Sequence, residues 1–367
     1  MRRGLYLHIP FCKQKCKYCD FASFAGQEQT INAYLEALSR EAALCEKADY
    51  HTLYVGGGTP SLLTEMQIEQ LCQIISKHFG SIVSFEESTF EANPESLTAS
   101  KAELLHALGF NRLSMGLQSF NDAELKTIGR VHTARQFLTA YETARKSSFT
   151  NLNVDLIAGL PGQTEVSFKE SLQTLAALEP EHLSVYGLQI EEGTVFFKQG
   201  IECDEDLMRT LLEQAHDFLT QAGYHHYEIS NFAKPGKEAK HNLNYWQNGE
   251  YLGLGCAAAS YQGGERRQNT PDLAAYITCM QTGKTPVVFS EKLEGKAHVG
   301  ETLLLGLRQL DGVEITPEEQ FLFGKEIDKN IQAGLLTKAD KKVKLTREGL
   351  FLANEVFRCF VAPFEEL

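Results

Sequence analysis

The 367-residue sequence has little positive charge and no long apolar run. Its net charge is −13, and no cluster of Lys and Arg provides the basic surface typical of nucleic-acid binding, so we expect no nucleic-acid partner. No stretch reaches the roughly 18 apolar residues that span a bilayer. The apolar run after Arg3 is interrupted by His8 and Pro10, which argues against a signal peptide. We therefore expect a cytoplasmic protein without a transmembrane segment, with peripheral membrane contact as an open alternative.

The cysteines do not indicate a disulfide framework, because there are nine and most are scattered. Three of them, Cys12, Cys16 and Cys19, form a C-x3-C-x2-C pattern just after a short apolar run. Thiolates are soft ligands that suit zinc or iron–sulfur centres. Structural zinc usually takes four protein ligands, and no second C-x-x-C pair follows, so a [4Fe-4S] cluster with one open iron is favoured over structural zinc. Lysines flank the cysteines and are expected to lower the thiol pKa values: Lys13, Lys15 and Lys17.

Apolar periodicity alternates between strands and helices through the first half of the chain. The predicted strands are Leu5–Ile9, His51–Val55, Ser88–Ala92, Arg112–Leu117, Leu152–Ile157 and His182–Leu188. The predicted helices are Gln29–Glu46, Glu65–His78, Ala99–Ala107, Asp122–Ile128, Ala134–Lys146, Glu165–Ala177 and Asp204–Gln221. This alternation predicts an α/β fold with a parallel sheet. Six strands are too few for a closed eight-stranded barrel, so we expect a partial (β/α)6 barrel; the spacing alone also fits a doubly wound sheet.

The pattern changes after residue 230, which predicts three units: a barrel domain over 1–230, a connecting segment over 231–290 and a C-terminal domain over 291–367. Helices are predicted over Lys296–Arg308, Pro317–Gly334 and Arg347–Phe360, with a small β-wing over Leu335–Leu345. This order is typical of a small, mostly helical, winged-helix-like domain. Its helices are not notably basic, so we interpret it as a packing module and not as a DNA-binding domain.

Several motifs of the first 190 residues resemble the radical S-adenosylmethionine (SAM) superfamily. The resemblance is closer to its oxygen-independent coproporphyrinogen III dehydrogenase branch, and it rests on residues 6–19, 56–61, 91–94, 116–120 and 155–162. It implies a [4Fe-4S] cluster on the three cysteines, SAM bound at the open iron, and an electron donor as a partner. The residues that match the SAM contacts of this superfamily are Tyr6, Tyr18, Gly57, Gly58, Thr59, Glu91, Gln118, Arg130 and Asp155, with Gln189 as a further candidate.

Two departures from the dehydrogenases point to the HemW-type heme chaperones of the same branch. Phe21 stands where the dehydrogenases carry an additional cysteine, and Cys12 lies closer to the first residue than in those enzymes. The run His241–Trp246 resembles the H-N-x-x-Y-W motif of these chaperones. The resemblance implies heme binding and transfer of heme to acceptor proteins such as respiratory enzymes. The dehydrogenase reaction stays as the alternative, and no catalytic residue is assigned.

The heme ligand is the least determined part of the prediction. His241 is the favoured candidate, because imidazole ligates heme iron and the neighbouring aromatic side chains can stack on a porphyrin. The alternative is that His241 packs inside an ordered loop. Cys256 and the pair His225–His226 are further candidate ligands.

Overall fold

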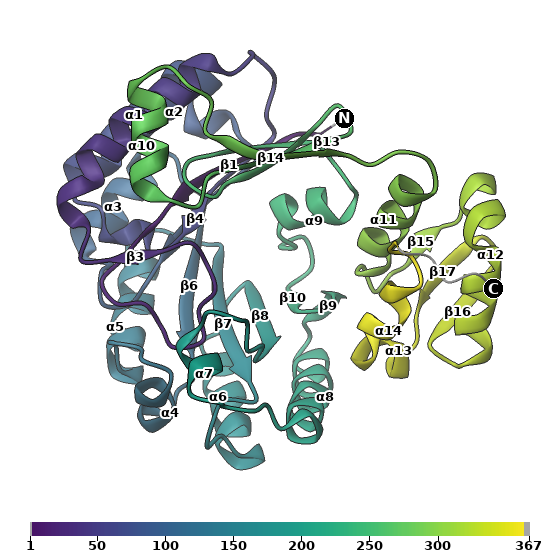
Figure 1. Ribbon diagram of the computed structural model, residues 1–367. Coiled ribbons are helices and arrows are strands. Elements are labelled where there is room, and N and C mark those ends of the chain that lie inside the picture. Colours follow the sequence, from purple (N-terminus) through teal and green to yellow (C-terminus); the bar gives the residue numbers. More distant parts are fainter. Residues whose placement is uncertain (1, 363–367) are drawn as a thin grey trace.

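The computed structural model describes residues 2–362 and has one large mixed sheet (Figure 1). Its strand order is β14-β13-β12-β11-β1-β4-β5-β6-β7-β8-β10-β9. Six neighbouring strands are parallel: β1 (Gly4–Ile9), β4 (Thr52–Gly57), β5 (Glu87–Ala92), β6 (Arg112–Gln118), β7 (Leu152–Ala158) and β8 (His182–Gly187). They correspond to the six predicted strands, and the partial (β/α)6 barrel is confirmed. Residue 1 and residues 363–367, which the predicted outer units include, lie outside the described part.

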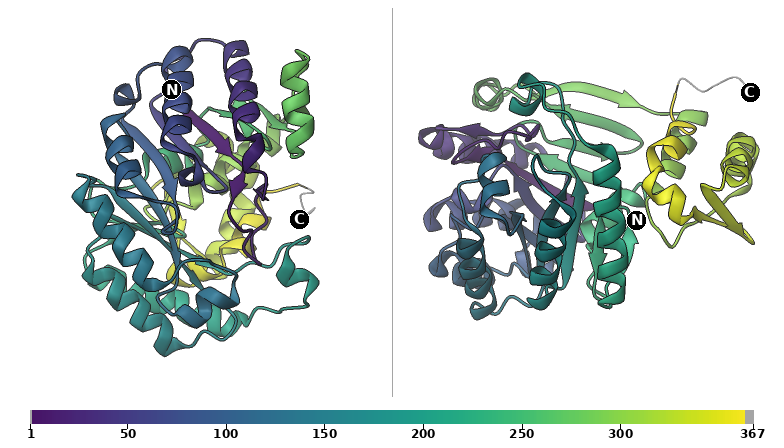
Figure 2. Two further views of the ribbon diagram at one scale, coloured as in Figure 1. Left: turned by 90° about the vertical axis from the view of Figure 1, so that its left-hand side faces the viewer. Right: turned by 90° about the horizontal axis from the view of Figure 1, so that it is seen from below.

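Helices cover the outer face of these strands (Figures 1 and 2). They are α1 (Ile31–Leu44), α2 (Glu65–Phe79), α3 (Ala99–Ala107), α4 (Asp122–Thr127), α5 (Ala134–Lys146), α6 (Glu165–Ala177) and α8 (Glu205–Gln221). Three of them begin with a threonine capping box, at Thr64, Thr133 and Thr164, which satisfies N–H groups that a helix start leaves unpaired. Their apolar faces pack on the outward Leu, Val and Phe side chains of the strands to form the main core.

The chain after residue 220 extends both edges of the sheet. At one edge lie β10 (Asn231–Ala233) and β9 (His225–Glu228). At the other edge, β11 (Tyr251–Leu254) pairs in parallel with β1 and is followed by β12 (Ala259–Gln262), β13 (Glu265–Asn269) and β14 (Val287–Lys292). Two helices also fall in this region, α9 (Lys240–Trp246) and α10 (Leu273–Gln281). The segment predicted as connecting therefore completes the sheet; the domain boundaries at 230 and 290 stay a prediction.

A second core lies in the C-terminal part, which stands beside α8, α9 and β9 (Figures 1 and 2). It consists of α11 (Gly295–Leu307), α12 (Pro317–Gln332), α13 (Arg347–Phe351), α14 (Ala353–Arg358) and a small sheet of β15 (Val313–Glu314), β17 (Lys342–Leu345) and β16 (Leu336–Ala339). The helix predicted over Arg347–Phe360 is in fact two helices, because the backbone leaves the helical region at Leu352. Ion pairs from Arg209 to Glu348 and from Arg347 to Asp217 join this part to α8.

The inner face of the parallel strands is unusually polar for a barrel. Inward positions on β6, β7 and β8 carry Arg112, Ser114, Asn153, Asp155 and Ser184, whereas closed barrels fill this space with branched apolar side chains. A polar interior leaves room and hydrogen-bonding groups for a ligand. None of the helices in residues 2–362 combines the length and the apolar character that crossing a membrane requires.

Candidate functional site

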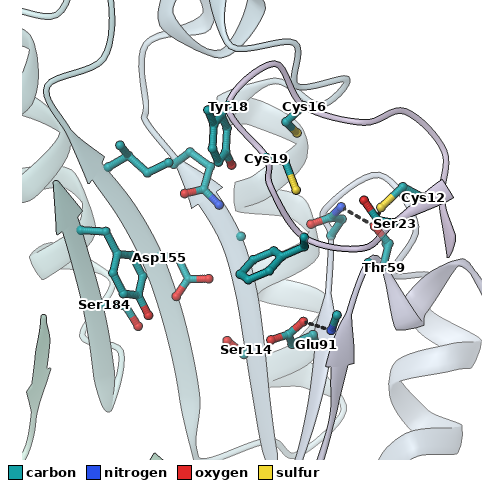
Figure 3. A pocket seen from close by; sticks show the side chains of 18 of the residues that line it. Cys12, Cys16, Tyr18, Cys19, Ser23, Thr59, Glu91, Ser114, Asp155 and Ser184 are labelled. Atoms are coloured by element: carbon teal, nitrogen blue, oxygen red, sulfur yellow. Dashed lines mark hydrogen bonds between the residues drawn. The ribbon is translucent and has the colours of Figure 1, made fainter. Parts of the chain in front are cut away.

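A cavity of about 340 Å³ lies inside the barrel and extends to the carboxyl ends of the parallel strands (Figure 3). This is the end at which parallel α/β sheets bind their ligands. Twelve of the residues predicted from the sequence line it: Cys12, Cys16, Tyr18, Cys19, Gly57, Gly58, Thr59, Glu91, Gln118, Arg130, Asp155 and Gln189. Tyr6 and His241 are not among its lining residues.

The three cysteines come from one loop on the side of the cavity (Figure 3). Cys12 ends the short strand β2 (Phe11–Cys12), which pairs with β3 (Phe24–Ala25), and the loop between these strands carries the other two. Backbone hydrogen bonds fix the loop: the N–H of Lys17 donates to the carbonyl of Ile128 at 2.9 Å, and the carbonyl of Lys17 accepts from the N–H of Phe196 in the short helix α7 (Val195–Lys198) at 2.9 Å. The loop is therefore held in place on two sides.

The lysines beside the cysteines have less effect than expected. Burial raises the pKa of Cys12 and of Cys19; Lys15 lowers the pKa of Cys19, but burial outweighs it. The hydroxyl of Thr59 donates a hydrogen bond to Cys12 Sγ at 3.5 Å, and Arg130 Nη1 lies 3.7 Å from Cys16 Sγ. Burial, and not the lysines, therefore dominates the pKa values of Cys12 and Cys19.

A single metal ion and an iron–sulfur cluster make different demands on the three sulfurs. Among residues 2–362, no three His, Cys, Asp or Glu side chains converge closely enough to hold one metal ion. Zinc requires sulfurs about 2.3 Å from the metal, whereas a cubane binds each thiolate through a different iron. His8 is not free to be a fourth ligand, because Nδ1 is bonded to Tyr6 Oη at 2.8 Å and Nε2 to the carbonyl of Ala22 at 2.8 Å.

The glycine loop after β4 is more than a tight turn. A Cβ on Gly58 would lie 2.7 Å from the carbonyl oxygen of Phe11, so only glycine lets this loop approach the segment that leads into Cys12. Gly57 has φ +112° and its N–H donates to Glu91 Oε2 at 3.0 Å. The loop thus links the cysteine segment to the carboxylate of Glu91.

The acidic and amide groups of the site are held by neighbouring strands. Tyr54 Oη donates to Glu91 Oε1 at 2.6 Å, and burial raises the pKa of Glu91 to about 7. Asn153 donates to Asp155 Oδ1 at 2.7 Å, and burial raises the pKa of that carboxyl as well. Gln118 adopts φ +77° at a bulge between β6 and β7, a conformation that is costly for a non-glycine residue and is common at functional sites.

Arg130 lies between the cysteines and the strand ends. Its Nη2 donates to Asn93 Oδ1 at 2.8 Å and to the carbonyl of Gly116 at 2.6 Å. The guanidinium is thereby fixed at the end of the cavity where the cysteines lie, and there it can face an anionic ligand group.

His241 does not present an open nitrogen to a heme iron. It is 1% exposed, its Nδ1 is bonded to Thr52 Oγ1 at 2.8 Å and its Nε2 to Tyr245 Oη at 2.7 Å. Burial lowers its pKa to about 3. The ring could ligate iron only after one of these bonds breaks.

The other candidate heme ligands are also engaged. Cys256 is fully buried and its thiol donates to the carbonyl of Thr270 at 3.3 Å. His226 pairs with His216 at 2.8 Å between their Nδ1 atoms, and burial lowers the pKa of His226 to about 3. His225 is more exposed than His226, and its Nδ1 lies 3.4 Å from Glu238 Oε1.

Helix α9, which carries the H-N-x-x-Y-W motif, lies between two cavities. Asn242 lines the main cavity, whereas Tyr245 and Trp246 line a second cavity of about 310 Å³ together with Tyr6. This second cavity is lined by β11, β13 and α11 residues as well. The motif therefore faces both spaces, although its histidine faces neither.

Sequence reasoning missed several side chains of the main cavity. They are Tyr54, Asn93, Arg112, Ser114, Asn153, Ser184, Tyr186 and Asn242. Polar residues at every second position of the predicted strands, such as Arg112 and Ser114, were the signal, since alternate strand residues share a face.

Comparisons with known proteins agree with this geometry. The sequence model of the Radical SAM superfamily matches residues 6–175. The heme chaperone HemW of Bacillus subtilis is 37% identical, with 98% of this chain and 99% of the relative covered, and that of Lactococcus lactis is 38% identical, with 97% and 96% covered. The structure of coproporphyrinogen III oxidase (HemN) from Escherichia coli, a radical SAM enzyme, has a TM-score of 0.86 and 27% identity, covering 98% of this chain and 90% of that one. The chain therefore belongs to the heme chaperone HemW family within the radical SAM superfamily.

Proposed function

We propose that this protein is a heme chaperone that holds a [4Fe-4S] cluster on Cys12, Cys16 and Cys19, binds SAM in the main cavity and transfers heme to acceptor proteins. The observation that carries the proposal is the similarity to heme chaperones over nearly the full length, including α9. Respiratory enzymes at the membrane are the proposed acceptors, reached from the cytoplasm by peripheral contact. An electron donor for the cluster is a further proposed partner.

The main cavity offers each part of SAM a suitable group. A bound cluster with one open iron would supply an electron and a binding point for the amino and carboxylate groups of SAM. The backbone of Gly57 and Gly58 allows close approach to the methionine moiety, and Arg130 lies at the same end. Glu91 and Asp155 can accept hydrogen bonds from ribose hydroxyls or the amino group, with Thr59 and Gln118 beside them.

The remaining SAM assignments differ in their support. Tyr18 and Gln189 line the cavity and can contact the ligand directly. Tyr6 lies behind the lining, so it would act by fixing His8, to which its hydroxyl is bonded at 2.8 Å. These roles concern binding and not catalysis.

Heme binding is proposed at α9. Tyr245 and Trp246 supply aromatic rings, of which that of Trp246 carries the guanidinium of Arg308 over one face, 4.2 Å from the ring centroid. The indole Nε1–H of Trp246 is buried without a hydrogen-bond partner among the described residues. A porphyrin can stack on such rings. His241 remains the proposed iron ligand, which requires release of its hydrogen bond to Tyr245.

The alternative is oxidative decarboxylation of coproporphyrinogen III. The observation in its favour is the agreement in fold with HemN over 98% of the chain. Against it stands Phe21, which is 62% exposed and lines the mouth of the main cavity at the position where the dehydrogenases carry an additional cysteine.

An anaerobic titration with heme, run beside an assay of coproporphyrinogen III conversion with SAM and reductant, separates the two functions. Stoichiometric heme binding without conversion supports the chaperone. Conversion to protoporphyrinogen IX refutes it in favour of the enzyme. The proposed heme-iron ligand is tested by His241→Ala, which should change the absorption spectrum of the bound heme. The control His106→Ala, on the outer helix α3, should leave this spectrum unchanged. An unchanged spectrum in both variants excludes His241 as the ligand.

A further inference from the structure

Arg112 is a charged group of the main cavity that the proposed function does not use. It lies on β6, lines the cavity and is only 2% exposed. Its Nε has no hydrogen-bond partner in the described part of the chain. Within residues 2–362, the guanidinium makes one side-chain hydrogen bond, a long contact of 3.5 Å from Nη1 to Thr89 Oγ1. A guanidinium has five N–H donors, so most of its hydrogen-bonding capacity is unused.

The nearby carboxylates of Glu91 and Asp155 do not accept hydrogen bonds from the Arg112 guanidinium in the described part of the chain. Burial raises the pKa of Asp155 and that of Glu91, the latter to about 7, while Arg112 acts on both pKa values in the opposite direction. Both carboxyls therefore lie within electrostatic range of Arg112, yet neither forms an ion pair with it in the described part of the chain. A buried cation without a paired anion is costly. An anion brought by a ligand would complete the site.

The single carboxylate of SAM is not suited to this role. In the proposed arrangement that carboxylate lies with the cysteines, beside Arg130, which is bonded to the carbonyl of Gly116. Gly116 is four residues beyond Arg112 on the same strand, or about 13 Å along it. The adenosine end of SAM carries no anionic group, and bound SAM adds a net positive charge. A carboxylate at Arg112 must therefore come from a second ligand.

We infer that Arg112 is an anchor for a carboxylate and binds a propionate group of the tetrapyrrole, a statement that rests on the proposed function. Arg112 shares the main cavity with Asn242 of α9 and with Ser114 and Ser184, whereas Tyr245 and Trp246 of the same helix line the second cavity. Burial, and after it Arg112, lowers the pKa of His241, so Arg112 lies within electrostatic range of the proposed iron ligand. A planar guanidinium binds a carboxylate through two parallel hydrogen bonds, which gives orientation as well as affinity.

The test compares hemin with hemin dimethyl ester, which has the same macrocycle but no free carboxylate. Binding of each is titrated to the full chain for wild type, Arg112→Gln, Arg112→Lys and the control Arg145→Gln, which removes an arginine outside the barrel that is paired with Glu181. Wild type and the control should prefer the free acid by about ten- to a hundredfold, the range expected for hydrogen bonds to a charged group. Arg112→Gln should abolish this preference, and Arg112→Lys should retain part of it.

Each outcome has a separate meaning. If wild type binds neither compound, the proposed function fails and the inference fails with it. If wild type prefers hemin and Arg112→Gln keeps the same preference, the inference is overturned while the chaperone function stands. A loss of SAM affinity without a change in the preference assigns Arg112 to SAM and also overturns it. Should Arg112→Gln not fold, Arg112→Lys decides, because an unchanged ratio in that variant contradicts a two-pronged contact.

Discussion

Gly58→Ala tests whether the glycine loop positions the cysteine segment. The added Cβ would lie 2.7 Å from the carbonyl oxygen of Phe11 and 2.9 Å from that of Ile9, both backbone atoms. Ordinary contact begins near 3.4 Å, so the strand end must move by about 3.4 − 2.7 = 0.7 Å. Overpacking of this kind costs about 1–3 kcal/mol. Because the displaced segment leads into Cys12, iron binding should fall as well as stability.

The assay combines thermal unfolding with the iron content of anaerobically reconstituted protein. Gly162→Ala is the matched control: Gly162 has φ +83° and a Cβ added there would meet no atom within 4 Å, so its cost is backbone strain of about 1–2 kcal/mol and its iron content should be unchanged. If Gly58→Ala bound iron and unfolded as wild type does, the loop would not position the cysteine segment. Equal losses of iron in both variants would also refute the reasoning.

Three further predictions address the cluster, the cavity and the core. Cys16→Ala should abolish the iron–sulfur absorption whereas Cys279→Ala should keep it; a full spectrum in the first variant would exclude Cys16 as a ligand. Burial raises the pKa of Glu91 from 4.5 to about 7. The contribution of Glu91 to the free energy of unfolding is therefore fully present below pH 4.5 and is lost as the pH rises through 7, by up to about 3 kcal/mol. In urea unfolding, Glu91→Gln should flatten this part of the pH profile, and an unchanged pH dependence would contradict the prediction. Glu41 accepts hydrogen bonds from Tyr276 Oη at 2.7 Å and from two further buried donors. Glu41→Ala should therefore lower the free energy of unfolding by at least about 3 kcal/mol in the same assay. A decrease below about 1 kcal/mol would show that the three donors find other partners.

The local features of this protein were accessible from sequence. The six parallel strands and their helices follow from apolar periodicity, which depends only on neighbours a few residues apart. The C-x3-C-x2-C pattern predicts a shared centre for the same reason, because its three thiols lie on one loop of eight residues. The single long helix expected over Arg347–Phe360 failed at Leu352, where no glycine or proline marks the break.

The contacts between distant segments were decided only by the tertiary structure. His241 is bonded to Thr52, 189 residues earlier in the chain, and this contact turns a promising heme ligand into a buried side chain. Strand β11 pairs with β1 across about two thirds of the chain, which no local pattern indicates. Arg112 could be placed on a strand from sequence, but its burial without a paired anion depends on which strands lie beside it. The sequence determined which residues alternate on each element, whereas packing and register between elements determined which of their side chains meet and which remain free for a ligand.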